Sequence, residues 1–143
     1  RRDPVQVLKE AMVEHQERFI HMKSLPHTIL YPIISHAEFV VFPSLIDNFS
    51  NACLEAMYFR RVVIGTDGTS YEQLIEDEKS GFLCEPGNRD SLLNAMNKAA
   101  IMRQTEKDQM GQYAKEKIDK LAPQYVVHKL LCYYQYIIDN VSK

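Results

Sequence analysis

The sequence lacks several features that would indicate a metal-binding or disulfide-rich protein. Its three cysteines are odd in number and scattered, without a Cys-x-x-Cys pair, which excludes a disulfide framework and a cysteine zinc motif. The five histidines include no pair at metal-ligating spacing, so we expect no bound metal. Cysteine usage of this kind favours a reducing compartment.

An excess of one charge and long apolar runs are also missing. The 17 basic and 19 acidic residues are interspersed and give a net charge of −2, which indicates neither a nucleic-acid partner nor a polybasic membrane patch. No apolar stretch approaches the ~18 residues of a membrane span, and no signal peptide opens the chain. We therefore expect a cytoplasmic protein, and 143 residues suffice for a single domain with a sizeable core.

The chain does contain an alternation of short apolar runs and helical patterns. Three runs are continuously apolar, as strands covered on both faces should be: 39–42, 62–64 and 82–84. A fourth candidate strand is 19–22. Helical patterns follow the three runs, and this alternation predicts an α/β fold with a Rossmann-like parallel sheet and flanking helices.

Helix boundaries are indicated by capping residues and prolines. Asp3 and Pro4 predict the start of a first helix, and Pro32 predicts a kink or a late start in a second one. Ser70 and Gln73 form a capping-box pattern for a helix over 71–77. Two amphipathic stripes separated at Pro123 predict that two helices close the chain.

A doubly wound domain normally begins with a strand and a glycine-rich turn, and neither is found before the first predicted helix. We therefore expect residues 1–143 to be a single partial Rossmann-like domain of a larger two-domain protein.

The stretch PSLIDNFSNACLEAM (43–57) follows the strand predicted at 39–42 and leads into a helix. Ligands of open α/β sheets bind outside the carboxyl ends of the strands, and a helix start favours phosphate. Asn51 and Ala52 would offer free amides there. Glu55, one turn later, could accept hydrogen bonds from ribose hydroxyls, and Asp47 could meet the other end of the ligand. This pattern predicts a sugar-nucleotide site.

The stretch FVVFPSLIDNFSNACLEAMYFRRVVIGTDGTSYEQLIEDEKSGFLCEPGNRDSLLNAM (39–96) resembles the C-terminal domain of GT-B retaining glycosyltransferases of family 4, or group 1. That family has Pro-Ser, then Glu-Gly-Phe-Gly, then Glu-Ala-Met eight residues after the first Glu. An apolar strand, a glycine-containing turn, an acidic helix, a Gly-Phe-Leu strand and a Pro-Gly turn come next.

The resemblance implies a role for each matching residue. Asp47 and Glu55 become the candidate catalytic residues, with Asp47 beside the transferred sugar and Glu55 on the donor ribose. Backbone contacts to the donor fall to the following matched positions: Asn48, Phe49 and Ser50 at the sugar, and Asn51 and Ala52 at the diphosphate. The loop of Met22, Lys23 and Ser24 would border the nucleobase.

For the intact protein, the resemblance implies transfer of a sugar from a UDP-, GDP- or ADP-sugar with retention of anomeric configuration, in polysaccharide or glycoconjugate biosynthesis. It implies no metal or other cofactor and a partner domain, N-terminal and acceptor-binding, that is not included here. We expect this chain alone to be inactive. A peripheral association of the intact protein with the inner face of the membrane is left open.

This sequence departs from the family pattern at three of the site positions. Asp47 replaces Glu and is one methylene shorter, while Asn48 and Ser50 replace both glycines, which could block positive φ angles or a close backbone approach. The alternative is therefore a non-catalytic binding or interaction module with a degenerate site. In that case Glu55 would be a structural carboxylate paired with a cation, and Asp47 would cap a turn.

Overall fold

A computed structural model describes residues 3–141, which divide into two compact units, one ending at Leu30 and one starting at Tyr31. The first unit contains α1 (Pro4–Ala11) and the 3₁₀ helix η1 (Val13–Arg18). As predicted, Asp3 is the N-cap of α1, and its carboxylate accepts a hydrogen bond from the Val5 amide at 3.1 Å.

The prediction of a strand at 19–22 was wrong. These residues have no regular structure, and the side chains of Ile20 and Met22 are exposed. A strand needs a partner strand for its backbone hydrogen bonds, and a four-residue apolar run carries no information about whether such a partner exists.

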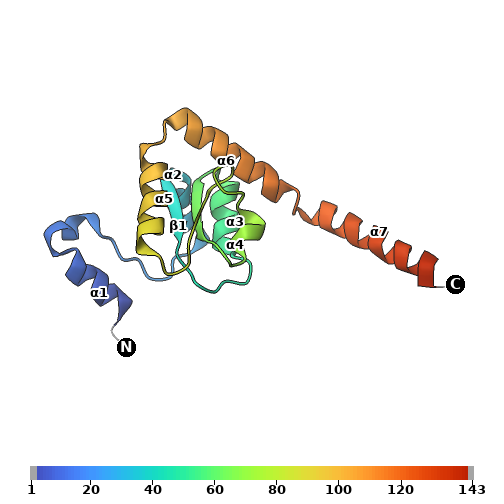
Figure 1. Ribbon diagram of the computed structural model, residues 1–143, viewed down its shortest axis with the longest axis horizontal. Helices are drawn as coiled ribbons and strands as arrows, with labels where there is room; N and C mark the ends of the chain where they lie inside the picture. Colours follow the sequence, from blue (N-terminus) through green and yellow to red (C-terminus); the bar gives the residue numbers. More distant parts are fainter. Residues whose placement is uncertain (1–2, 142–143) are drawn as a thin grey trace. The chain divides into compact units, whose positions relative to one another are not determined.

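The second unit is built on a parallel sheet of three strands, counted within residues 31–141: β1 (Phe39–Phe42), β2 (Val62–Thr66) and β3 (Phe82–Cys84) (Figure 1). The strands lie in the order β1-β2-β3, with Phe39 opposite Val62 and Ile64 opposite Phe82. All three strands start within one residue of their predicted positions.

The predicted helices are present in the structure, but not all of the residues predicted to begin or cap them do so. They are α2 (His27–His36), α3 (Asn51–Tyr58), α4 (Tyr71–Leu74), α5 (Arg89–Ile101), α6 (Gln104–Asp119) and α7 (Pro123–Val141). Because α2 already begins at His27 and continues past Pro32, the late start predicted from this proline was wrong. The two predicted closing helices are α6 and α7.

Both faces of β2 are covered, since all five of its residues are buried. On one face, Val62 and Ile64 pack with Phe82 and with buried residues of α5 and α6 such as Ala99 and Met110. The opposite face lies against α4, because Gly65 directly faces Tyr71 and Ile75. A parallel sheet with helices on both faces confirms the predicted α/β, Rossmann-like class.

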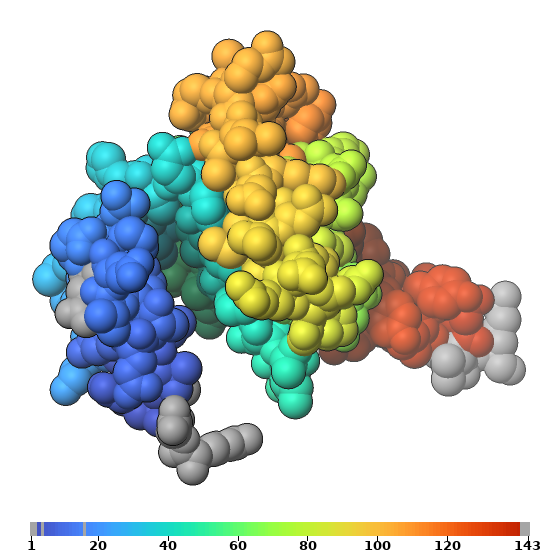
Figure 2. All heavy atoms as spheres, turned by 60° about the vertical axis from the view of Figure 1, so that its left-hand side comes forward, coloured from blue at the N-terminus to red at the C-terminus, as the bar shows by residue number. Residues whose placement is uncertain are grey.

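Since the strands are parallel, the segments that follow them leave from the same edge of the sheet. These segments are the 43–50 loop after β1, the 67–70 turn after β2 and the turn before α5 after β3. Figure 2 shows the 43–50 loop, in blue-green, projecting at the same edge as the residues that lead into α5, in yellow-green. The candidate site residues 47–52 therefore lie at the carboxyl edge.

Helix α7 has an apolar surface that is exposed. About half or more of each of the following side chains is accessible to solvent: Tyr125, Val126, Val127, Leu130, Leu131, Tyr133, Tyr134, Tyr136 and Ile138. Among residues 3–141, no helix is both long and apolar enough to span a membrane.

Candidate functional site

The first turn of α3 presents two unused backbone donors. Ser50 is the N-cap residue, and its hydroxyl accepts a hydrogen bond from the Cys53 amide at 3.3 Å. The Leu54 amide donates to the Ser50 carbonyl at 3.1 Å. Within the part of the chain that the structure describes, the amides of Asn51 and Ala52 have no acceptor, and both residues are exposed. Two parallel N–H groups at the positive end of a helix form an anion-binding arrangement.

The loop before α3 shows where its backbone is strained. Phe49 has a φ of 90°, a left-handed value that costs a non-glycine residue on the order of 1 kcal/mol or more. Ser50 has a φ of −66°, and Asn48 is not among the described residues with positive φ. The two positions where the family pattern has glycine therefore have no positive φ here. That Asn48 and Ser50 hinder a positive φ or a close backbone approach to a donor stays a prediction.

Asp47 is held by a residue that the sequence did not indicate. The Tyr71 hydroxyl donates a hydrogen bond of 2.8 Å to Asp47 Oδ2. Tyr71 is the first residue of α4 and lies 24 positions further along the chain, so no local pattern connects it to the acid. Burial raises the pKa of the Tyr71 hydroxyl above its usual range, and the hydrogen bond to Asp47 raises this pKa further.

The Tyr71 ring is fixed by both neighbouring strands. It is almost completely buried and stacks on Phe42, the last residue of β1, with ring centroids 5.7 Å apart. Gly65 in β2 makes room for the ring, because a Cβ at this position would lie 2.8 Å from Tyr71 Cβ and Cγ. The Tyr71 hydroxyl is therefore held at the carboxyl edge of the sheet, next to Asp47 of the 43–50 loop.

A hollow of about 470 Å³ opens in front of Asp47. Its lining consists of Asp47, Asn48, Phe49, Gly68, Thr69, Ser70 and Gln73. The Ser70 hydroxyl is buried and has no hydrogen-bond partner among the described residues. An unpaired buried hydroxyl costs about 1–3 kcal/mol, and the Ser70 oxygen is shielded from the hollow because almost none of its surface is accessible.

The predicted capping box of α4 was wrong, for a related reason. The Ser70 side chain does not cap the helix; the Thr69 hydroxyl accepts from the Tyr71 amide at 3.3 Å instead. The Glu72 carboxylate accepts from the Gly68 amide, so a different acidic residue closes the turn. The helix is also shorter than predicted and ends at Leu74.

Glu55 likewise meets a tyrosine hydroxyl. Tyr31 in α2 donates to Glu55 Oε1 at 3.3 Å, and its ring lies 5.3 Å from that of Phe59. Burial and the Glu55 carboxylate together raise the pKa of Tyr31. Glu55 lines a hollow of about 500 Å³, together with Tyr31, Leu54, Tyr58, Phe59, Ile118, Asp119, Leu121 and Ala122. The two acids thus line two separate hollows, and along the chain they stand before and after the first turn of α3.

Cys53 is part of the core and has no role as a nucleophile. It is fully buried, and burial followed by the nearby Asp47 charge raises the pKa of its thiol to about 12. A thiol with this pKa is protonated at neutral pH.

The predicted nucleobase loop lies in the first unit of the chain. Met22, Lys23 and Ser24 are exposed and line a hollow of about 690 Å³ with other residues of that unit, among them Val5 and Leu30. Their contact with a nucleobase stays a prediction.

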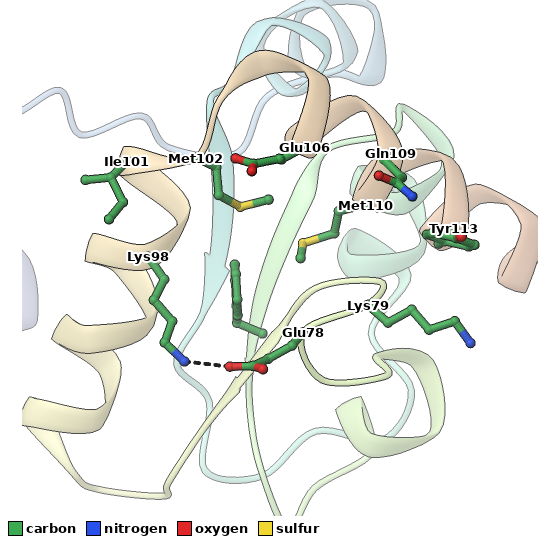
Figure 3. A pocket seen from close by; sticks show the side chains of 10 residues that line it. Glu78, Lys79, Lys98, Ile101, Met102, Glu106, Gln109, Met110 and Tyr113 are labelled. Carbon is green, nitrogen blue, oxygen red and sulfur yellow. Dashed lines mark hydrogen bonds and ion pairs between the residues drawn. The ribbon is translucent and has the colours of Figure 1, made fainter.

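A further hollow, of about 580 Å³, lies at the amino edge of the sheet, opposite the candidate site (Figure 3). Met102 and Met110 form part of its lining. Its charged residues are already paired: Lys98 with Glu78 at 2.6 Å, Lys79 with Glu76 at 2.9 Å, and Glu106 with Arg103 at 2.7 Å. With its charges neutralised in this way, this hollow offers less to a charged ligand than the carboxyl edge does.

Potential metal ligands do not gather anywhere in the described structure. Within residues 3–141, no three side chains of His, Cys, Asp or Glu lie close enough together to bind an ion. The donors at the start of α3 are backbone amides, which bind anions.

Solved structures with the same fold are glycosyltransferases of the GT-B class. Sucrose-phosphate synthase from Thermosynechococcus elongatus superposes with a TM-score of 0.75 at 20% identity, over 98% of this chain and 36% of that one. A glycosyltransferase from Rickettsia africae gives a TM-score of 0.72 at 19% identity, over 95% of this chain and 37% of that one. The present chain therefore spans little more than a third of either protein.

A shorter solved structure also matches. It is the C-terminal domain of a group 1 family glycosyl transferase from Francisella tularensis, with a TM-score of 0.61 at 19% identity, over 82% of this chain and 64% of that one. The fold is thus the Rossmann-like C-terminal half of a GT-B glycosyltransferase.

Sequence similarity identifies the family. The sequence profile of the glycosyl transferases group 1 matches residues 6–117, and the chain belongs to this family. No curated protein sequence matches the chain significantly.

Proposed function

We propose that this chain is the donor-binding domain of a retaining glycosyltransferase, which transfers a sugar from a nucleotide diphosphate sugar to an acceptor. One observation carries the proposal: along the chain, the two free amides at the start of α3 come between Asp47 and Glu55, and each of these acids accepts a hydrogen bond from a tyrosine hydroxyl. Donors for a diphosphate with hydroxyl acceptors on both sides match the order of groups in a sugar nucleotide.

In the proposed complex the amides of Asn51 and Ala52 bind the diphosphate, and the dipole of α3 favours its negative charge. Glu55, one turn further along the helix, accepts hydrogen bonds from the ribose hydroxyls. Asp47 faces the transferred sugar from the hollow that it lines with Asn48 and Phe49. Each group of the donor then meets protein atoms of complementary charge or hydrogen-bonding type.

During transfer, the bond between the anomeric carbon and the diphosphate oxygen breaks, and a bond to the acceptor oxygen forms on the same face of the sugar. The acceptor proton passes to the departing diphosphate, whose growing negative charge is stabilised by the α3 amides. The proposal requires no cofactor from this chain. Acceptor binding belongs to the remainder of the intact protein, which we propose acts in the cytoplasm.

Calorimetric titration of the full-length protein with UDP, GDP and ADP tests this function. We expect one of the three to bind, and we expect Glu55→Ala to weaken that binding by about 1.5–3 kcal/mol through loss of a charge-assisted hydrogen bond. Glu116→Ala is the matched control, because Glu116 is an exposed acid of α6 that is not among the residues lining the hollows of Glu55 and Asp47. It should bind like the wild type.

A sugar donor carrying the selected nucleotide would then show, by NMR of the product's anomeric proton, whether configuration is retained. Inversion would refute the retaining mechanism. If none of the three nucleotides binds at millimolar concentration, the chain is a non-catalytic module rather than a donor-binding domain.

A further inference from the structure

Asp47 is the site residue at which this chain departs from its family in side-chain length, and its hydrogen-bond partner is the buried Tyr71. An aspartate carboxylate is one methylene closer to its own backbone than a glutamate carboxylate. It therefore reaches less far into the hollow, and its position depends more strongly on what holds it.

Tyr71 is the residue that holds the Asp47 carboxylate in place. Its hydroxyl donates a hydrogen bond to Asp47 Oδ2 at 2.8 Å. Among residues 3–141, no donor contacts Asp47 Oδ1. Because the ring is wedged between Phe42 and Gly65, the hydroxyl cannot follow the carboxylate if it turns away. The side chain of Asp47 thus has one fixed oxygen and one that is unused.

A ring alone would have satisfied the packing at this position. Phenylalanine would fill the space between Phe42 and Gly65 equally well, and the buried hydroxyl is favourable only because it has an acceptor. That acceptor is the Asp47 carboxylate. The phenol therefore ties the 43–50 loop to α4 through Asp47.

Ser70 lines the same hollow of about 470 Å³ as Asp47. It directly precedes Tyr71, and its hydroxyl is buried and without a partner among the described residues. The hollow therefore has the Asp47 carboxylate, and not the Ser70 hydroxyl, as a group open to a ligand.

We propose that Tyr71 is a positioning residue for the donor sugar, which fixes Asp47 through Oδ2 so that Oδ1 accepts a hydrogen bond from a sugar hydroxyl in this hollow. This inference rests on the proposed function, because it concerns the sugar end of the same donor. It adds that the affinity for the sugar depends on a residue that does not itself contact the sugar.

The test compares nucleotides with and without their sugar in the full-length protein. Dissociation constants are measured for UDP, GDP and ADP and for UDP-glucose, GDP-mannose and ADP-glucose, with the wild type and Tyr71→Phe. For the nucleotide that binds, Tyr71→Phe should change the affinity for the diphosphate less than about twofold. The affinity for the sugar nucleotide should fall about tenfold, as expected for loss of a hydrogen bond to a charged group.

A double-mutant cycle separates positioning from packing. If Tyr71 acts through Asp47, Asp47→Asn/Tyr71→Phe should bind the sugar nucleotide no more weakly than Asp47→Asn alone. Tyr113→Phe, on the surface of α6, is the control for loss of a tyrosine hydroxyl and should match the wild type in both affinities.

Three results overturn the inference. They are an unchanged affinity of Tyr71→Phe for the sugar nucleotide, an equal loss for diphosphate and sugar nucleotide, and additive effects of the two substitutions. In all three cases the diphosphate still binds to the wild type, so the proposed function stands. If no diphosphate binds to the wild type, the proposed function fails first and this inference fails with it.

Discussion

Substitution of Gly111 by alanine tests the packing of α6 against the end of α3. In the interior of an exposed helix this change normally stabilises a protein by about 0.5–1 kcal/mol, because glycine loses more backbone entropy on folding. Gly111 is buried, however, and a Cβ at this position would lie 2.1 Å from the Arg60 carbonyl oxygen and 2.7 Å from its carbonyl carbon. Ordinary contact begins at 3.4 Å, so the backbones would have to separate by more than 1 Å.

The Arg60 carbonyl cannot move cheaply. Arg60 has a left-handed φ of 57° at the turn after α3, and its amide donates to the Met57 carbonyl at 3.0 Å. Overpacking of this kind costs up to about 3 kcal/mol, and the helix propensity of alanine offsets about 1 kcal/mol. We therefore expect Gly111→Ala to lower the free energy of unfolding by about 2 kcal/mol, or the melting temperature by about 8 °C.

The assay is thermal and urea unfolding followed by circular dichroism. Gln109→Ala is the matched control, since Gln109 is an exposed position of the same helix, and its stability should stay within about 0.5 kcal/mol of the wild type. A Gly111→Ala protein as stable as the wild type, or more stable, would refute the close approach of α6 to Arg60.

Three further predictions concern the candidate site and its surroundings. At pH 8, iodoacetamide should label the exposed Cys132 but leave Cys53 unmodified, because the Cys53 pKa is about 12; equal labelling by mass spectrometry would contradict its burial. Burial and then the hydrogen bond to Asp47 raise the pKa of Tyr71 from its usual 10. The stability that the protonated Tyr71 hydroxyl contributes is therefore complete below pH 10 and is lost as the pH rises through the raised pKa. Asp47→Asn should lower this pKa, measured by phenolate absorbance, and an unchanged value would argue against the hydrogen bond. Ser70→Ala should raise the free energy of unfolding by up to about 1 kcal/mol in ligand-free protein, whereas a loss in urea unfolding would mean that the hydroxyl has a partner.

The sheet was predictable because its signal is local. Buried parallel strands are continuous apolar runs, and the runs at 39–42 and 82–84 match β1 and β3 in full. The run at 19–22 has the same local signal but no partner strand among residues 3–30 of its own unit. Pairing depends on what lies alongside a segment, and a single run of residues does not contain this information.

The backbone arrangement of the site could be predicted from the sequence, whereas the hydrogen-bond partners of its side chains could not. The helix start at Asn51 followed from Pro43 ending one strand and from the polar 47–51 segment. Neither Tyr31 nor Tyr71 could be assigned to an acid, because each lies 24 residues from its partner and meets it only after the sheet has formed. Ser70 was misassigned, because Ser and Gln three apart indicate a capping box whether or not a neighbouring threonine takes that role.

The unused amides of Asn51 and Ala52 have a consequence for how this family can diverge. A contact made by a backbone N–H is independent of the side chain, so any residue except proline can stand at either position without loss of that donor. Residue identity can therefore drift at the proposed diphosphate contact while its backbone donors persist. Sequence alignment will underestimate how much of such a site two distant relatives share. Structural comparison of where their helices begin will detect the shared backbone donors.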